Sequence, residues 1–278
     1  MNKFLKLVNF EMNRFRKFFF VLLLITFVLQ FAGVIVTSFS FTHRANKMMA
    51  EMSMTPAQFV KENGYASFEI VSKSLWFMGP IAICAVVLGL YIFLIWYRDW
   101  FGKNTFIFRL LMLPTSRINL FLSKAAAIFL YVLGLIAFQL IILPFENALF
   151  KGIVPSELKY DLGIRALLGS NEYMSLIIPH SFFNFVIYYG AGLVSIFIIF
   201  TGILFERSYR LKGIILGIVY CAVAAVVLFS PFIVAGIVLK NRIFYPIEVL
   251  GLSIITALIV LFGSLSVSGY LLKNKVTV

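Results

Sequence analysis

The sequence predicts an all-α integral membrane protein with six transmembrane helices. Of its 278 residues, 62% are hydrophobic and only 13% are charged, which leaves too little polar surface for a chain dissolved in water. The apolar residues also gather into six stretches without Asp, Glu, Lys or Arg, each long enough to cross a hydrocarbon core, which takes roughly 20 helical residues. These stretches cover residues 18–42, 74–97, 125–145, 181–205, 213–239 and 249–272.

Each stretch is hydrophobic on all sides, as expected for a helix surrounded by lipid or by other helices. A transmembrane β-barrel would show alternating residues instead. The two longer connections, residues 43–73 and 146–180, are too short for independent domains, so residues 1–278 are expected to form a single transmembrane domain. In the fifth stretch, Pro231 and Gly236 predict a short broken or re-entrant piece after the main helix.

The basic residues predict the orientation of the spans, because Lys and Arg are retained on the cytoplasmic side of short loops. Fifteen of the 24 lie on the face that holds both chain ends, and nine lie on the other face. The N- and C-termini are therefore expected in the cytoplasm. The expected location is a cell membrane, and a bacterial one. The formal charge of +13 reflects this asymmetry and an attraction to anionic headgroups, so membrane lipid is an expected partner and nucleic acid is not.

Residues 1–17 predict an amphipathic helix that lies along the inner membrane surface. The apolar residues of this segment recur at helical spacing, whereas most of its basic residues fall elsewhere. The apolar set is Phe4, Leu7, Val8, Met12 and Phe15. Such a helix can be an anchor or an elbow that transmits motion into the first span, and the sequence leaves both open.

A short helix is also predicted in the first outer connection. Thr55, Pro56 and Gln58 form a capping box with proline at the first helical position, and Asn63 with Gly64 supplies a stop.

The inner loop from Arg98 to Lys124 is too long for a tight turn and too apolar for a solvated linker. Its apolar residues at helical spacing predict a helix that ends before proline, since the residue before proline is disfavoured in the α conformation. The helical set is Phe106, Ile107, Leu110 and Leu113, followed by Pro114, with Thr115 or Ser116 able to cap the next helix. A surface helix on lipid headgroups and a helix that docks on a partner both fit this pattern.

Patterns that carry enzyme chemistry are absent from the sequence. The two histidines, His43 and His180, do not form an H-E-x-x-H pattern, and no serine has a G-x-S-x-G context. There is no G-x-x-x-x-G-K-[ST] either, so the chain cannot bind ATP through a P-loop. The chain is therefore predicted not to be an enzyme, with no cofactor, catalytic residue or metal site of its own.

Coupling to a proton or sodium ion is disfavoured, because such transporters usually place ionisable residues within the membrane. The six stretches contain none, and Glu146 and Glu248 fall only at outer ends. The polar residues inside the stretches, Gln139, Asn184 and Thr201, are expected to serve helix packing.

The loop with the most specific pattern reads YRDWFGKNTFIFRLLMLPTSRINLFLSK from Tyr97 to Lys124. It resembles the inner loop of the membrane subunit of type-2 ABC exporters, in which an acidic residue and a glycine precede an apolar helix and a Leu-Pro-x-Ser-Arg turn. In that family the loop is the coupling helix that contacts a separate ATPase subunit. The residues that the resemblance assigns to coupling are Asp99, Gly102, Phe106, Arg109, Leu110, Leu113, Pro114, Ser116 and Arg117.

The resemblance implies a permease subunit that forms the translocation path of an ATP-driven exporter. ATP and Mg would be bound by a partner ABC ATPase, and a second copy of this chain or a similar permease would complete the transporter. The substrate could be a peptide, a lipid or an amphiphilic antibiotic. The alternative is a membrane-embedded sensor, immunity or scaffolding protein without transport activity.

Overall fold

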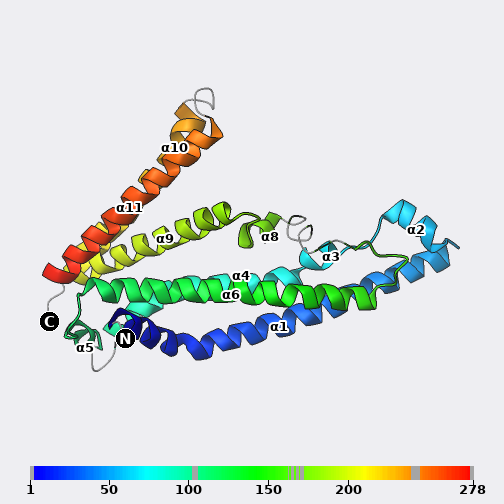
Figure 1. The fold of residues 1–278 in the computed structure, drawn as a ribbon, viewed down its shortest axis with the longest axis horizontal. Coiled ribbons are helices and arrows are strands. Elements are labelled where there is room, and N and C mark those ends of the chain that lie inside the picture. The colour runs from blue at the N-terminus through cyan, green and yellow to red at the C-terminus, as the bar shows by residue number, and fades with distance from the viewer. Residues whose placement is uncertain are drawn as a thin grey trace. The chain divides into compact units, whose positions relative to one another are not determined.

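The computed structural model describes residues 3–101, 106–161, 172–238 and 245–275, together with residues 163, 166 and 169. All regular elements in these ranges are helical (Figure 1). They are α1 (Lys3–Glu51), α2 (Pro56–Asn63), α3 (Glu69–Ser72), α4 (Leu75–Trp100), α5 (Phe106–Leu111), α6 (Ile118–Ile153), α8 (Glu172–Ile177), α9 (Phe182–Tyr209), α10 (Leu211–Ile233), the π-helix η1 (Val234–Val238) and α11 (Pro246–Asn274).

Six helical segments of the described chain are long and apolar enough to cross a membrane. They correspond in order to the six predicted stretches, and they are α1, α4, α6, α9, residues 211–236 and residues 247–274. The prediction of an all-helical, multi-pass membrane protein is confirmed to this extent.

The chain divides into two compact units. Unit 1 consists of residues 1–14, 88–130 and 186–278, and unit 2 consists of residues 15–87 and 131–185. Helices α1, α4, α6 and α9 therefore each have residues in both units.

The N-terminal segment is not a separate helix, contrary to the expectation of a distinct interfacial element. Helix α1 runs without a break from Lys3 to Glu51. At 1.5 Å per residue its 49 residues reach about 73 Å, which is more than twice the roughly 30 Å of a hydrocarbon core. A large part of α1 must therefore lie beyond the hydrocarbon, even though it is continuous with the span.

The core of unit 2 joins α1, α4 and α6 to the connecting segments between them. Phe68, which precedes α3, packs edge to face against Phe77 of α4 and Phe150 of α6, with ring centroids 6.0 Å apart in both pairs. Such aromatic pairs add to the stability gained by burial. Val34 of α1 and Leu143 of α6 are buried in the same cluster.

The predicted outer helix is confirmed as α2. Thr55 and Gln58 bond reciprocally to each other's backbone N–H, which completes the capping box. Gly64 ends the helix with a positive φ of 79°, a conformation that glycine adopts without steric cost. The segment between α2 and α3 is fixed by a hydrogen bond, in which the Ala66 N–H donates to the carbonyl of Leu158 at 2.8 Å.

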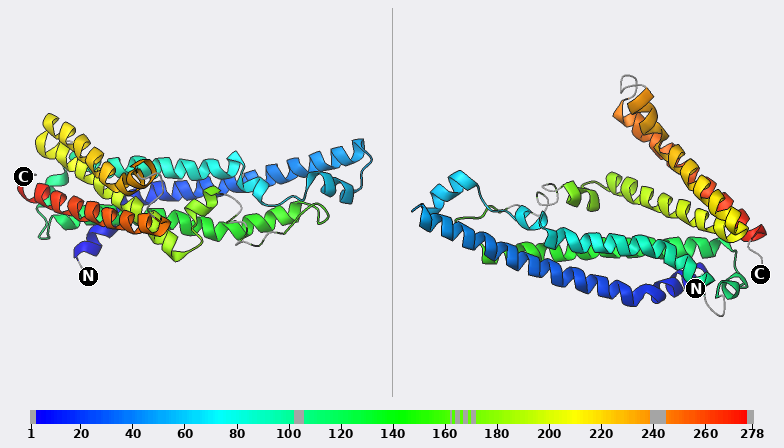
Figure 2. Two further views of the ribbon diagram at one scale, coloured as in Figure 1. Left: turned by 90° about the horizontal axis from the view of Figure 1, so that it is seen from above. Right: turned by 180° about the vertical axis from the view of Figure 1, so that it is seen from behind.

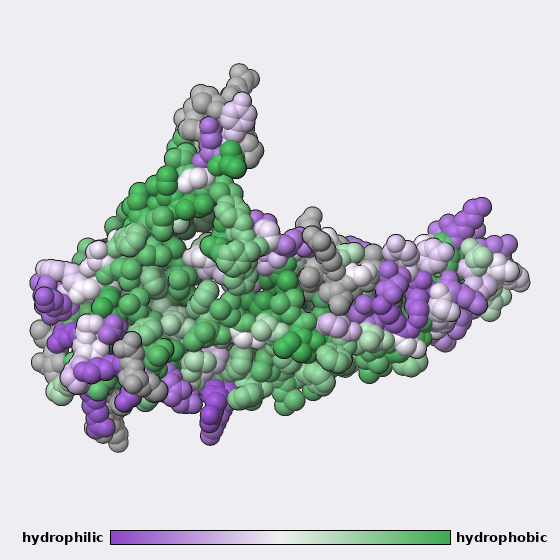
Figure 3. Space-filling view, viewed as in Figure 1, coloured by the Kyte–Doolittle hydropathy of each residue, from purple (hydrophilic) through white to green (hydrophobic). Residues whose placement is uncertain are grey.

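In unit 1, α9, α10 and α11 pack together through Val194, Ile198, Ala224 and Val260. Figures 1 and 2 show α10 and α11 side by side, as an antiparallel pair. Figure 3 shows that apolar side chains cover most of the visible surface along the middle of this pair. Long exposed apolar faces are expected where lipid or another membrane helix is the neighbour.

Two glycines allow the backbones of α9 and α10 to approach closely. A Cβ atom built on Gly217 would lie 2.7 Å from the carbonyl oxygen of Gly202, and one on Gly202 would lie 2.8 Å from Cys221 Sγ. Small residues at such contacts are a common means of helix association in membranes. Helix α9 is also hydrogen-bonded to α11, because the hydroxyl of Thr201 lies 2.9 Å from the hydroxyl of Ser268.

The segment after α10 departs from a regular α-helix. Helix α10 contains Pro231, and the chain continues as the π-helix η1 from Val234 to Val238. Proline removes one backbone donor and commonly accompanies such irregularities. The predicted break near Pro231 and Gly236 thus takes the form of a change in helix type, while residues 239–244 lie outside the described residues.

Glu146, which the sequence places at the outer end of the third span, lies within α6. The helix continues to Ile153 and buries Glu146 completely. Neither carboxyl oxygen has a hydrogen-bond partner within the described part of the chain. Since α6 has 36 residues, more than a hydrocarbon core requires, the position of Glu146 at the outer end of the span stays a prediction.

We expect Gly217→Ala to destabilise the packing of α9 on α10 by about 1–3 kcal/mol, the usual cost of overpacking, since the new methyl group would meet backbone atoms of Gly202. The measurement is the thermal unfolding midpoint of the protein in detergent. Gly251→Ala is the matched control, because nothing lies within 4 Å of a Cβ at that position. Equal midpoints for the two variants would contradict the close approach.

We expect Glu146→Gln to leave the thermal midpoint unchanged or to raise it. The substitution keeps the size of the side chain and removes a carboxyl group that is buried without a described partner. Burying such a group costs free energy, because it must either lose the hydration of its charge or take up a proton, and the amide of Gln does neither. A clear fall in the midpoint would instead mean that the carboxyl group has a stabilising partner.

Candidate functional site

The site predicted from sequence lies at the end of unit 1 where α4 ends and α6 begins. The first turns of α1 belong to the same unit. Three helix ends and the short helix α5 therefore contribute to it, and the contacts among them all fall within unit 1.

A buried ion cluster joins the three helix ends. We define it as Glu11 and Arg14 of α1, Arg98 and Asp99 of α4, and Lys124 of α6. The Lys124 ammonium donates to Glu11 Oε1 at 2.8 Å and to Asp99 Oδ2. A guanidinium nitrogen of Arg14 lies 2.6 Å from Asp99 Oδ1, and one of Arg98 lies 3.2 Å from Glu11 Oε2.

The centre of the ion cluster is shielded from solvent. Lys124 and Asp99 have 0% exposed side chains and Glu11 has 1%. The third donor of the ammonium goes to the Ile95 carbonyl at 3.0 Å, and Trp96 places its ring centroid 5.3 Å from the same nitrogen. The ammonium therefore has all three of its hydrogen bonds satisfied, as a buried charge requires.

The pattern of buried residues explains why these side chains meet. Glu11 lies on the face of α1 that also buries Leu7, Val8 and Phe15, and Lys124 lies among buried neighbours such as Phe121. An acidic residue within an apolar stripe and a basic residue at the start of an apolar helix must be paired in order to be buried. Glu11 was not predicted as a site residue, although its place within the stripe of residues 1–17 was a visible signal.

Helix α5 is short and is buried on one side only. Ile107, Leu110 and Leu111 are at most 7% exposed, whereas Met112 is 69% and Leu113 40% exposed. Arg109 is also exposed. The helix ends at Leu111, earlier than Pro114 requires, and residues 112–117 form turns before α6.

The turn after α5 is held by two basic side chains. The Lys3 ammonium donates to the Pro114 carbonyl at 2.6 Å. The Arg117 guanidinium donates to the Leu272 carbonyl at 2.6 Å, in the last turn of α11, where carbonyl groups lack helical donors and attract cations. Arg117 thus links the start of α6 to the end of α11.

An aromatic cluster fixes the end of α9 to the end of α4. The Arg207 guanidinium carbon lies 4.7 Å from the ring centroid of Tyr97, 5.0 Å from that of Phe101 and 5.7 Å from that of Trp100. The adjacent Glu206 accepts a hydrogen bond from the Tyr97 hydroxyl. Cation–π contacts of this kind stabilise partly exposed helix ends.

The structure separates the predicted coupling residues into groups. Arg109, Leu113, Pro114 and Ser116 are exposed, and Leu110 faces the interior of unit 1. Asp99 and Arg117 are engaged within the unit, so any effect of these two on a partner has to be indirect. Gly102 lies outside the described residues, and of Phe106 only the backbone is described, as the first residue of α5.

In the described ranges no group of three or more His, Cys, Asp and Glu side chains is arranged to hold a metal ion. The described contacts instead connect the ends of α1, α4 and α6 to one another. The segment around α5 has exposed residues beside them. These features define a multi-pass helical membrane protein with an internally braced loop region. Comparisons with protein-family models, curated proteins and solved structures give no match for this chain.

We expect Lys124→Met to destabilise the protein by about 3–5 kcal/mol, because it leaves Glu11 and Asp99 buried without their common partner. A double-mutant cycle with Asp99→Asn should show strong coupling between the two positions. The control is Lys47→Met, which removes an exposed pair in which Lys47 Nζ lies 3.8 Å from Glu51 and should change the midpoint little. Additive effects of the two buried substitutions would contradict a shared ion cluster.

Proposed function

We propose that the chain is the permease subunit of an ATP-driven exporter of the type-2 ABC class. It would form the translocation path together with a second copy or a similar permease, and it would be driven by a separate cytoplasmic ATPase. The observation that carries the proposal is the segment from Tyr97 to Lys124. It combines the family-like sequence with a short helix, α5, that exposes Arg109 and is followed by an exposed turn.

The exposed residues of this segment could contact a partner protein. Arg109 of α5 is exposed, and so are Met112 and Leu113 in the turn that follows the helix. Exposed large apolar residues beside a cation, outside the spanning segments, favour contact with a protein surface that has acidic and apolar groups.

The bracing supports a mechanical role for the loop. The ion cluster ties the ends of α4 and α6 to the start of α1, Arg207 ties the end of α9 to α4, and Arg117 ties the end of α11 to α6. A push on α5 would therefore reach several helices of unit 1 as a rigid displacement. Movement of packed helices in response to a partner is a common form of conformational coupling.

In this proposal ATP and Mg are bound by the partner, and this chain contributes no residue to hydrolysis. The exposed apolar faces of α10 and α11 would meet lipid or the second permease. The proposed substrate class is a peptide, a lipid or an amphiphilic antibiotic, carried between the two permeases. Both termini would lie in the cytoplasm of a bacterial cell.

We expect a P-loop ATPase to co-purify with the tagged chain from native membranes in mild detergent, identified by mass spectrometry. Arg109→Glu combined with Met112→Glu should abolish this co-purification, since both side chains are exposed and the substitutions place acidic groups at the proposed contact. The matched control is Lys212→Glu combined with Lys273→Gln, which changes the net charge by the same amount at two exposed positions in unit 1 and should leave the complex intact.

Failure of every form of the chain to retain an ATPase would reject the exporter proposal and favour a sensor, immunity or scaffolding protein. Equal loss with the control pair would show that net charge matters and that α5 is not the contact.

A further inference from the structure

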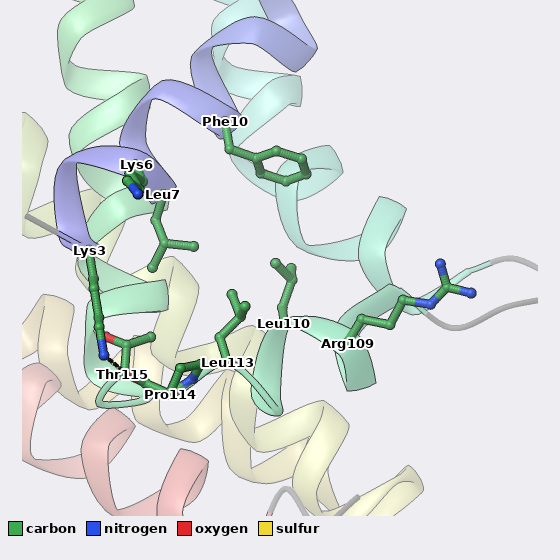
Figure 4. A pocket seen from close by; sticks show the side chains of 9 residues that line it. All are labelled: Lys3, Lys6, Leu7, Phe10, Arg109, Leu110, Leu113, Pro114 and Thr115. Carbon is green, nitrogen blue, oxygen red and sulfur yellow. Dashed lines mark hydrogen bonds between the residues drawn. The ribbon is translucent and has the colours of Figure 1, made fainter. Parts of the chain in front are cut away.

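A groove lies between the first turns of α1 and the segment that contains α5. Its volume is about 450 Å³, within the range of ordinary ligand sites. Figure 4 shows Leu7 and Phe10 of α1 turned toward Leu110 and Leu113, so that four apolar side chains surround a common space. Nearly all of the accessible lining is apolar.

The rim of the groove is cationic. Lys3 and Lys6 line it from α1 and Arg109 lines it from α5, and no acidic residue is among the described lining residues. Figure 4 shows the Arg109 guanidinium directed away from the apolar centre, while Lys3 reaches across toward Pro114. The Lys3 ammonium uses one of its three donors on the Pro114 carbonyl, so it can still donate to an anion.

We propose that this groove binds an anionic phospholipid, with an acyl chain among the four apolar side chains and the phosphate beside Lys3 and Lys6. An apolar cavity with a cationic rim matches a molecule that is apolar along its length and negatively charged at one end. Basic pockets beside membrane helices bind anionic headgroups for the same reason.

The groove suits a lipid better than a protein segment. A protein chain brings backbone N–H and C=O groups that must be satisfied on burial, and this lining offers them almost no polar partners. This inference does not depend on an ATPase partner.

The experiment uses the full chain in nanodiscs and a phosphatidylglycerol that carries a diazirine in one acyl chain. After irradiation and digestion, mass spectrometry locates the adducts. We expect adducts in the peptides that contain Leu7 and Phe10 or Leu110 and Leu113. The phosphatidylcholine analogue with the same diazirine should label these peptides far less, and excess glycerol phosphate without acyl chains should not compete.

Lys3→Gln combined with Lys6→Gln should reduce the groove adducts roughly twentyfold or more, because each basic side chain near a membrane contributes about fivefold to anionic-lipid affinity. Both residues are exposed, and Gln keeps a donor for the Pro114 carbonyl. The matched control, Lys212→Gln with Lys273→Gln, removes the same charge elsewhere in unit 1 and should leave the adducts unchanged.

Three results would overturn the proposal. The first is equal labelling of the groove by the two lipids, and the second is equal loss of labelling in both variant pairs. The third is labelling confined to other helices such as α10 and α11, which would show that lipid reaches the protein but does not enter the groove. None of these results would bear on whether an ATPase binds at Arg109 and Met112.

Discussion

The hydrogen bonds of the Lys124 ammonium group hold together the part of unit 1 where α4 ends and α6 begins. The ammonium group has no exposed surface and binds carboxylates from two other helices, Glu11 of α1 and Asp99 of α4. Burial of three charged groups is unfavourable unless each finds its partners, so the helix ends can occupy these positions only together. The same requirement fixes the register of α1 against α4 and α6, because a shift of one residue along α1 would move Glu11 away from the ammonium.

Six basic residues near the ends of α1, α4 and α6 differ in what surrounds them. Lys124, Arg14 and Arg98 are paired with acids inside the ion cluster, whereas Lys3, Lys6 and Arg109 surround a groove without an acidic lining residue. The first class stabilises the unit through specific geometry, and the second leaves positive charge available to anionic partners. A count of Lys and Arg along the chain predicts a topology, but it cannot distinguish a buried charge from one that faces outward.

The sequence was sufficient for the six spanning helices and for α2, because both rest on local patterns: apolar length for the spans, and the Thr55 to Gln58 capping box for α2. It was insufficient where the outcome depends on distant contacts. The role of Glu11 requires Lys124, 113 positions away, and the Arg117 bond to Leu272 spans 155 positions. Nor did the sequence show that α6 continues past Glu146 to Ile153 and buries this side chain.

The placement of α5 follows from its length. A helix of six residues is not stable by itself in water, so its position is set by the burial of Ile107, Leu110 and Leu111 and by the braces at either end. Leu110 and Leu113 border the groove on one side, and Arg109 extends from the other side of the segment (Figure 4). A ligand in the groove and a partner at Arg109 would therefore bias the same small element, and the energetic effect of each on the other has to be reciprocal.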